Sequence, residues 1–168
     1  MGYMGCGKSA VGKGLAQLKS LLFIDLDKYI ESQEKTTISQ IFEQKGELYF
    51  RKKERFYLEK ILSEEAKAVI SLGGGTPCYF DNVDFVVQKK EILSLYLKTS
   101  PKTLAGRLFD QKDHRPVITH LKTLENLEEF IAKHLFERVP FYIKAEHHFI
   151  TDHQRVDELV NQIEKLLA

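Results

Sequence analysis

Short apolar segments alternate with longer segments of helical periodicity along the chain. Four of the apolar runs have the length of strands: Leu22–Ile24, Ala68–Leu72, Ile92–Leu97 and His148–Thr151. Such alternation is typical of parallel strands joined by helical crossovers. The pattern therefore predicts an α/β fold built on a central parallel sheet.

Polar residues and glycines indicate where the helices begin and end. Thr37 and Gln40 have the spacing of a capping box, and Gly46 is expected to end the helix that follows them. Ser100, which a proline follows, is a typical helix start. Apolar residues at helical spacing predict the last helix over residues 156–167.

The length of 168 residues fits a single domain, and no repeat or linker divides residues 1–168. The polar stretch at about residues 110–123 has no strong periodicity, so we expect a mobile loop there. A loop of this length in a compact domain is usually functional or disordered.

Charge and cysteine content narrow the class of protein. The net charge of +1 gives no reason to expect a nucleic acid or a membrane as partner. The two cysteines, Cys6 and Cys78, have no metal-site spacing and fit a reducing compartment. The chain shows neither a secretory signal nor an apolar run of spanning length, so we expect a cytoplasmic location.

The first residues match the pattern G-x-x-x-x-G-K-[ST] at every fixed position, from Gly2 to Ser9. Glycines let the backbone N–H groups of such a loop point at phosphate oxygens. Lys8 can then reach the β- and γ-phosphates, and the Ser9 hydroxyl can bind Mg²⁺. The alternative is a glycine-rich turn without function, but an amphipathic helix follows, as a phosphate-binding loop requires.

A loop of this kind normally follows a strand, and only Met1 precedes Gly2. Either the sequence starts late, or the fold lacks this strand. In the second case we expect four strands arranged around a gap. Exposed strand edges would face that gap.

Two carboxylates, Asp25 and Asp27, come at the end of the first predicted strand. If the strand continues through both residues, their side chains point the same way, toward the ligand crevice at the carboxyl edge of the sheet. One carboxylate can then hold Mg²⁺, and the other can accept a hydrogen bond from an attacking hydroxyl. The alternative is that Asp27 only caps the next helix.

Arginines and glycines supply the remaining candidates. Arg51 can bind a carboxylate through two bonds, and Glu54 is placed to orient it at i,i+3 spacing. Gly73–Gly75 would let the backbone approach a ligand without obstruction by side chains. Arg115 lies in the polar loop and Arg138 lies near a helix end. Each single arginine could equally belong to an exposed charged surface.

Together these motifs resemble those of the shikimate kinase family over nearly the whole chain. They occur in the order G-Y-M-G-C-G-K-S, F-I-D-L-D, I-F-E-Q-K-G-E-L-Y-F-R-K-K-E, I-S-L-G-G-G, H-R-P and E-R-V-P-F-Y. The first motif alone occurs in many nucleotide enzymes. Its combination with D-L-D, G-E-x-x-F-R-x-x-E and G-G-G is far more specific.

The resemblance implies a three-layer α/β/α fold of the P-loop NTPase and nucleoside-monophosphate-kinase type. It also implies a lid loop at about 110–123 and an acceptor-binding region at about 28–62. The implied reaction transfers the γ-phosphoryl group of ATP to the 3-hydroxyl of shikimate, in aromatic amino-acid biosynthesis, with Mg²⁺ as cofactor. The implied enzyme is a monomer whose ligands are ATP and shikimate.

The same similarity assigns roles to residues of this chain. The implied catalytic residues are Lys8, Asp27 and Arg115, where Asp27 orients or deprotonates the attacking hydroxyl and Arg115 folds over the phosphates. The implied nucleotide-binding residues are Gly5, Cys6, Gly7, Lys8, Ser9, Ala10, Arg107 and Arg115. The implied acceptor-binding residues are Asp27, Arg51, Gly73, Gly74, Gly75 and Arg138. Ser9 and Asp25 would hold the metal ion.

Two other functions stay open at this point. The chain could be another small-molecule kinase of this fold, acting on gluconate or on a nucleoside monophosphate. Arg51, Arg138 and Gly73–Gly75 argue against that, because they suit a carboxylated, polyol-like ring. The chain could also be a non-catalytic nucleotide-binding module, which only the missing first strand favours.

Overall fold

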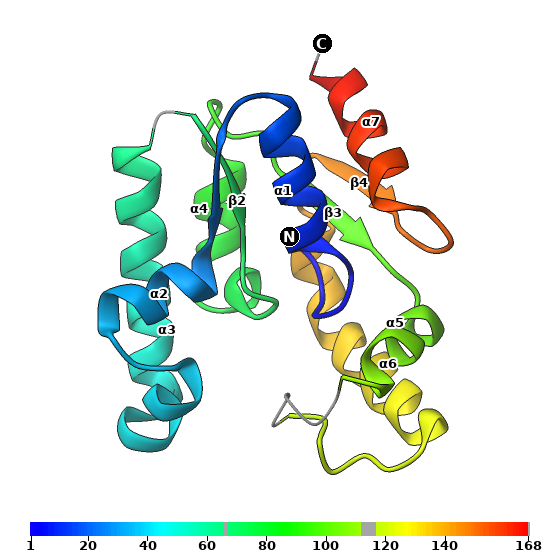
Figure 1. Ribbon diagram of the computed structural model, residues 1–168. Helices are drawn as coiled ribbons and strands as arrows, with labels where there is room; N and C mark the ends of the chain where they lie inside the picture. The colour runs from blue at the N-terminus through cyan, green and yellow to red at the C-terminus, as the bar shows by residue number, and fades with distance from the viewer. Residues whose placement is uncertain (66, 112–116, 168) are drawn as a thin grey trace.

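The computed structural model describes residues 1–65, 67–111 and 117–167 (Figure 1). The helices are α1 (Lys8–Leu18), α2 (Leu26–Glu34), α3 (Ile38–Glu64), the 3-10 helix η1 (Thr76–Cys78), α4 (Asn82–Val87), α5 (Pro101–Phe109), α6 (Leu124–Tyr142) and α7 (Val156–Leu166). The strands are β1 (Leu22–Asp25), β2 (Ala68–Ser71), β3 (Leu95–Lys98) and β4 (His147–Ile150). Strands and helices alternate as the sequence predicts, and no described helix has the length and apolar character needed to cross a membrane.

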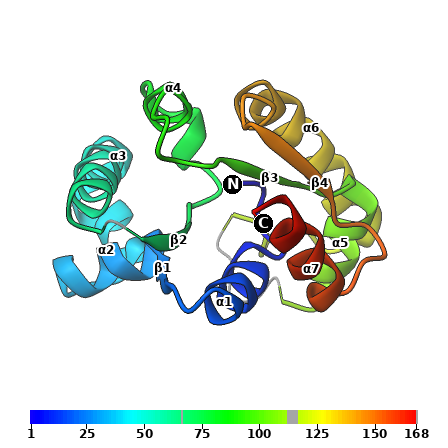
Figure 2. The ribbon, with the colours of Figure 1, turned by 90° about the horizontal axis from the view of Figure 1, so that it is seen from above.

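The strands form two separate parallel pairs, β1 with β2 and β3 with β4. Figure 2 shows the N-terminus between the two pairs, with α1 and α7 on one side of the strands and α4 and α6 on the other. The predicted parallel sheet is thus divided in two, and the expected arrangement of four strands around a gap is confirmed. The described fold keeps the three layers of the predicted α/β/α class.

Met1 borders the gap on the side of β3. Its amino group donates a hydrogen bond to the carbonyl of Leu95 at 2.5 Å, and the N–H of Leu97 donates to the Met1 carbonyl at 3.0 Å. A cavity of about 470 Å³ lies between the strand pairs, and most of its lining is apolar, including Leu15, Val69 and Leu95. The division of the sheet therefore leaves a mainly apolar groove in the middle of the molecule.

Local capping explains most of the helix ends. Thr37 caps α3: its hydroxyl accepts from the N–H of Gln40 at 3.2 Å, and the Gln40 side chain accepts from the N–H of Thr37 at 3.1 Å. The hydroxyl of Ser100 accepts from the N–H of Thr103 at 3.3 Å and caps α5. Gly46 interrupts α3 with φ 78° and ψ 170°, but a second helical segment follows directly. The two predicted helix starts are confirmed, and the predicted end of the first helical segment at Gly46 is confirmed as well.

Six predicted strand boundaries are wrong, the start of β3 by three residues and the other five by one. β3 begins at Leu95 and not at Ile92, and β4 ends at Ile150, before Thr151. The register pairs Leu95 with His147, so the partner strand determines where each ladder begins. Local apolar character cannot reveal that limit.

The apolar core has two parts, one for each pair of strands. One part includes Leu104, Leu127 and Ile163, and brings β3 together with α1, α5, α6 and α7. The other includes Leu26 and Ile61, and holds α2 and α3 against β1 and β2. The predicted acceptor-binding region is thus built mainly on the second part, and the phosphate-binding loop on the first.

Candidate functional site

The loop from Gly2 to Ser9 has a backbone that requires its glycines. Gly2, Gly5 and Gly7 have φ values of 146°, 78° and 101°, which L side chains rarely adopt. A Cβ on Gly2 would also lie 2.7 Å from the Leu97 carbonyl oxygen. Gly7 is the N-cap of α1, so the loop leads directly into the positive end of a helix. This is the geometry of an anion-binding site.

Hydrogen bonds within the protein hold the side chains of Lys8 and Ser9 in fixed orientations. The ammonium group of Lys8 donates to the carbonyls of Gly2 and Tyr3, both at 2.9 Å. The hydroxyl of Ser9 donates to Asp25 at 2.8 Å. A hydroxyl and a carboxylate side by side are a donor set that fits Mg²⁺, which takes few protein ligands and keeps several waters.

Asp25 and Asp27 differ in structure, contrary to the idea that one strand carries both. β1 ends at Asp25, whose carboxylate accepts a bond from the N–H of Lys28 at 3.4 Å and caps α2. Asp27 therefore lies in the first turn of α2. The alternative in which Asp27 caps this helix is also wrong, because Asp25 is the cap. The sequence alone did not indicate which of the two aspartates caps α2, and this choice decides where β1 ends and α2 begins.

Asp27 occupies a largely desolvated position beside other charges. Its pKa is raised to about 6, chiefly by burial and then by the negative charges of Glu54 and Asp25, while the positive charges of Lys8 and Arg51 partly offset these effects. A carboxylate with a pKa near neutrality is well suited to accept a proton. Asp27 is within electrostatic reach of Lys8, in the phosphate-binding loop, and of Arg51, on α3.

Gly73–Gly75 lie at the centre of these side chains, directly after β2. A Cβ on Gly73 would lie 2.6 Å from Oδ1 of Asp27 and 3.1 Å from Oε1 of Glu54. A Cβ on Gly75 would lie 2.8 Å from Nη2 of Arg51. The two outer glycines make room for the side chains of the site itself, and the approach of a ligand to this triplet stays a prediction.

Arg51 is fixed by a buried network. Arg51 is 8% exposed and Glu54 is 1% exposed, and the Nη1 atom of Arg51 donates to Glu54 at 2.9 Å. Glu54 also accepts a bond from the Thr76 hydroxyl at 2.6 Å. The aromatic ring of Tyr79 lies 3.8 Å from the guanidinium carbon of Arg51. The orienting role of Glu54 is confirmed, whereas Thr76 and Tyr79 had no recognisable signal in the sequence.

Arg138 approaches the same glycines from α6. Its Nη1 atom lies 3.7 Å from the position of a Cβ on Gly74, and its guanidinium carbon lies 5.7 Å from the centre of the Tyr3 ring. Arg138 is half-buried and forms no ion pair with any residue in the described ranges. Arg51 and Arg138 therefore approach the same glycines from two different helices. Carboxylates form ion pairs with the charge of Arg51, and no described carboxylate forms one with Arg138.

Three other predicted residues have different settings. Arg107 donates to the carbonyl of Gly5 at 3.3 Å and to that of Thr151 at 2.9 Å, so it connects the phosphate-binding loop to the end of β4. Cys6 is buried, which leaves only its backbone for a ligand, and Ala10 is exposed in α1. Arg115 lies outside the described residues.

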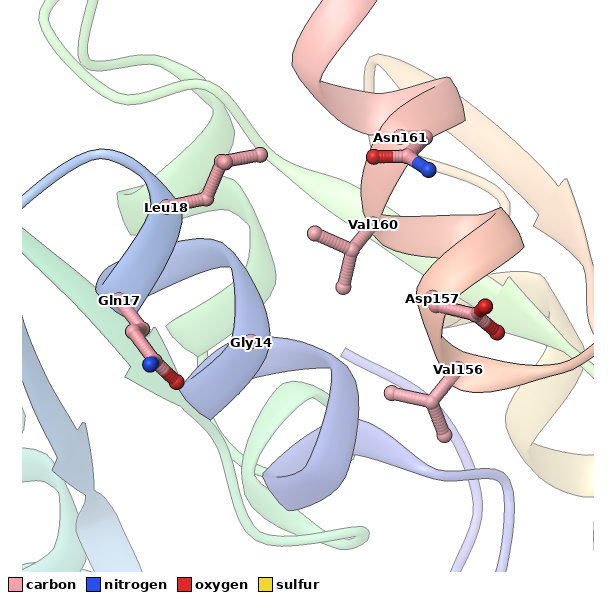
Figure 3. A pocket seen from close by; sticks show the side chains of 7 residues that line it. All are labelled: Gly14, Gln17, Leu18, Val156, Asp157, Val160 and Asn161. Atoms are coloured by element: carbon pink, nitrogen blue, oxygen red, sulfur yellow. The ribbon is translucent and has the colours of Figure 1, made fainter.

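A separate hollow lies between α1 and α7, away from the phosphate-binding loop (Figure 3). Val156 and Val160 of α7 point toward α1 there, and a Cβ on Gly14 would lie 2.9 Å from Val160. The hollow contains none of the predicted site residues. The candidate site is therefore the region between the phosphate-binding loop and Arg51.

Comparison with known proteins agrees with this geometry. The sequence model named "Shikimate kinase" matches residues 4–168. The shikimate kinase of Flavobacterium johnsoniae is 44% identical over 168 residues, which cover 100% of this chain and 96% of that protein. That of Parabacteroides distasonis is 43% identical over 167 residues, covering 99% of this chain and 94% of that protein.

Solved structures are similar as well. The crystal structure of shikimate kinase from Bacteroides thetaiotaomicron matches with a TM-score of 0.90 and 36% identity, covering 99% of this chain and 95% of that one. Shikimate kinase from Acinetobacter baumannii in complex with shikimate matches with a TM-score of 0.85 and 32% identity, covering 99% and 89%. The chain belongs to the shikimate kinase family.

Proposed function

We propose that this chain transfers the γ-phosphoryl group of ATP to the 3-hydroxyl of shikimate and that Asp27 accepts the proton of that hydroxyl. The observation that carries this proposal is the position of Asp27 beside Gly73 and Glu54, within electrostatic reach of both Lys8 and Arg51, with a pKa raised to about 6 mainly by burial. Lys8 marks the phosphate side of the site and Arg51 marks the acceptor side. A base placed between them can reach an acceptor hydroxyl that faces the nucleotide.

Arg51 and Arg138 would bind the carboxylate of shikimate. Arg51 is rigid because Glu54 holds its Nη1 atom at 2.9 Å, and a preorganised guanidinium loses little freedom on binding. Arg138 adds a positive charge that no described carboxylate neutralises by an ion pair. Gly73, Gly74 and Gly75 would keep the pocket open, since they carry no Cβ between these side chains and the acceptor.

The phosphate-binding loop would hold ATP. Backbone N–H groups from Gly5 to Ala10 and the ammonium group of Lys8 would contact the phosphates, while Ser9 and Asp25 would hold Mg²⁺. The metal ion supplies charge neutralisation at the phosphates when bound. We further assign Arg107 to the nucleotide base and Arg115 to closure over the phosphates. The cytoplasmic location and the monomeric state stay predictions.

The acceptor distinguishes this proposal from other kinases of the same fold. The relatives described above are named shikimate kinases, which favours shikimate over gluconate or a nucleoside monophosphate. A carboxylated acceptor also fits the convergence of Arg51 and Arg138 beside Gly74. The chain keeps the residue types that phosphoryl transfer requires, which favours a catalyst over a non-catalytic nucleotide-binding module. These residues are Lys8, Ser9, Asp25 and Asp27.

The test is the release of ADP from Mg-ATP, measured with and without shikimate and with gluconate as an alternative acceptor. We expect turnover that depends on shikimate and that falls by at least about a hundredfold in Asp27→Asn, because general base catalysis contributes roughly 10²–10⁴-fold. Asp157→Asn, an exposed residue of α7, is the matched control and should keep full activity. Turnover with gluconate alone, or full activity of Asp27→Asn, would contradict the proposal.

A further inference from the structure

The carboxylate of Glu47 lies against the guanidinium of Arg51. Its Oε1 atom accepts hydrogen bonds from Nε and Nη2 of Arg51 at 3.4 and 3.3 Å, and from the Tyr79 hydroxyl at 2.6 Å. Nε and Nη2 form one of the edges through which an arginine binds a carboxylate with two parallel bonds. A carboxylate of the chain itself therefore occupies a binding edge of Arg51.

Arg138 also acts on this carboxylate. The Tyr79 hydroxyl, and then the positive charges of Arg51 and Arg138, hold the pKa of Glu47 below its usual range. Glu47 is therefore ionised near neutral pH and lies within electrostatic reach of both arginines. This is the same pair of arginines that is proposed above to bind the carboxylate of shikimate.

The other contacts of Arg51 are closed to a ligand. Glu54 holds Nη1 and is 1% exposed, and the Tyr79 ring covers one face of the guanidinium at 3.8 Å. The side chain of Glu47, in contrast, is 51% exposed. Glu47 is therefore the partner of Arg51 that a ligand can displace into solvent.

The backbone next to Glu47 favours such a movement. Gly46 has φ 78° and ψ 170°, so the helix α3 is interrupted immediately before Glu47. Glu47 begins the second helical segment, and its side chain has no preceding helical turn to pack on. Rotation of this side chain therefore disturbs neither the buried network around Glu54 nor the apolar core.

We propose that Glu47 competes with the acceptor for Arg51: its carboxylate occupies the binding edge of Arg51 in the ligand-free protein, and a carboxylate of the acceptor must displace it. This inference rests on the proposed binding roles of Arg51 and Arg138. A neutral ligand cannot compete with an ionised carboxylate for a guanidinium, so it binds without displacing Glu47 and its affinity does not depend on the charge of Glu47. The same contact weakens the binding of the correct acceptor by the strength of the Glu47–Arg51 ion pair.

The test compares Glu47→Gln with the wild-type chain in steady-state kinetics with Mg-ATP. Glutamine keeps the size of the side chain and an acceptor for the Tyr79 hydroxyl but removes the charge. We expect the KM for shikimate to fall roughly two- to fivefold, the range of a half-exposed ion pair. Glu43→Gln makes the same change of charge on the exposed side of α3 and should leave this KM unchanged.

A neutral ligand shows whether Glu47→Gln acts by ending the competition for Arg51 or by changing the pocket in general. The carboxamide of shikimate, used as a competitive inhibitor, should bind to the wild-type chain and to Glu47→Gln with equal affinity. If Glu47→Gln leaves the KM for shikimate unchanged or raises it, Glu47 orients Arg51 and the inference is wrong. An equal gain for the carboxamide would also overturn it.

Calorimetric binding of shikimate without ATP makes the same comparison independently of turnover. A lower Kd in Glu47→Gln supports the inference even if no phosphoryl transfer occurs, in which case only the proposed reaction fails. An unchanged or higher Kd overturns the inference even if the wild-type chain is an active kinase.

Discussion

Asp27 is a carboxylate whose surroundings disfavour its charge. Burial, together with Glu54 and Asp25, raises its pKa to about 6, whereas an aspartate in the unfolded chain has a pKa of 3.8. The unfolded chain therefore releases this proton at a lower pH than the folded chain. Above a pH of about 4, the ionisation of Asp27 thus works against folding.

Asp27→Asn should consequently stabilise the protein at neutral pH while it removes activity. We expect the free energy of unfolding at pH 7 to rise by about 1–3 kcal/mol, since the shift in pKa spans roughly two units. The gain should shrink as the pH falls through 6 and vanish near 4, where the aspartate is protonated in both states. Urea unfolding at pH 4, 5, 6 and 7 measures this difference, and a loss of stability at pH 7 would contradict it.

Gly73 illustrates how the absence of a single side chain shapes the site. Its φ is not left-handed, but a Cβ would lie 2.6 Å from Asp27 and 2.9 Å from Thr76. Gly106, in the middle of α5, has no atom within 4 Å of the same position.

Gly73→Ala should therefore destabilise the protein by about 1–3 kcal/mol through overpacking, and it should reduce turnover with shikimate at least tenfold because Asp27 must move. Gly106→Ala, the matched control, should stabilise it by about 0.5–1 kcal/mol, because alanine is the better helix former. Thermal unfolding and ADP release measure both effects. Equal behaviour of the two variants would show that Asp27 has room to move.

At the scale of elements, Glu34 connects α2 to α3. Its carboxylate accepts hydrogen bonds from the hydroxyls of Tyr57 at 2.7 Å and Tyr49 at 2.9 Å, and forms an ion pair with Lys53 at 2.9 Å. The bond from Tyr57 is the main reason that the pKa of Glu34 is lowered to about 2. Because α2 carries Asp27 and α3 carries Arg51, this cluster connects the two helices of the acceptor side.

Glu34→Gln should weaken that connection. We expect a loss of about 1–2 kcal/mol in the free energy of unfolding at pH 7, typical of hydrogen bonds to a charged group. Since the folded pKa is lowered, the contribution of Glu34 is complete above a pH of about 4.5 and disappears as the pH falls toward 2. Wild type and variant should therefore converge in acid, and a constant difference between them from pH 7 to pH 3 would refute the assignment.

The sequence predicted features that depend on neighbouring residues, and it did not predict contacts between distant elements. Thr37 and Ser100 cap their helices through bonds to residues three positions away, so the sequence alone was enough to predict them. Lys8 and Ser9 were predictable because a phosphate-binding loop is a continuous motif. Glu54 was predictable as a partner of Arg51 because it lies three residues away on the same helix. Tyr79, which stacks on Arg51, and the partners of Glu34 come from other elements, and no local pattern indicates them.

At the scale of the whole molecule, both strand pairs point their carboxyl ends toward the site. β1 leads to Asp25 and Asp27, β2 leads to Gly73–Gly75, and Thr151, after β4, contacts Arg107. Alternation of strands and helices predicted this parallel arrangement. The residues that line the groove between the two strand pairs come from distant segments of the chain, so their arrangement depends on packing that no local pattern reveals.

The most direct test of the role of Asp27 is the pH dependence of kcat/KM for shikimate at saturating Mg-ATP, measured for the wild-type chain and for Asp27→Asn. A base must be ionised to accept a proton, so the wild-type value should rise about tenfold per pH unit below 6 and level off above it. Asp27→Asn should show a much lower value without this acid limb. A wild-type value that does not change between pH 5 and 8, or an acid limb that persists in Asp27→Asn, would show that another group accepts the proton.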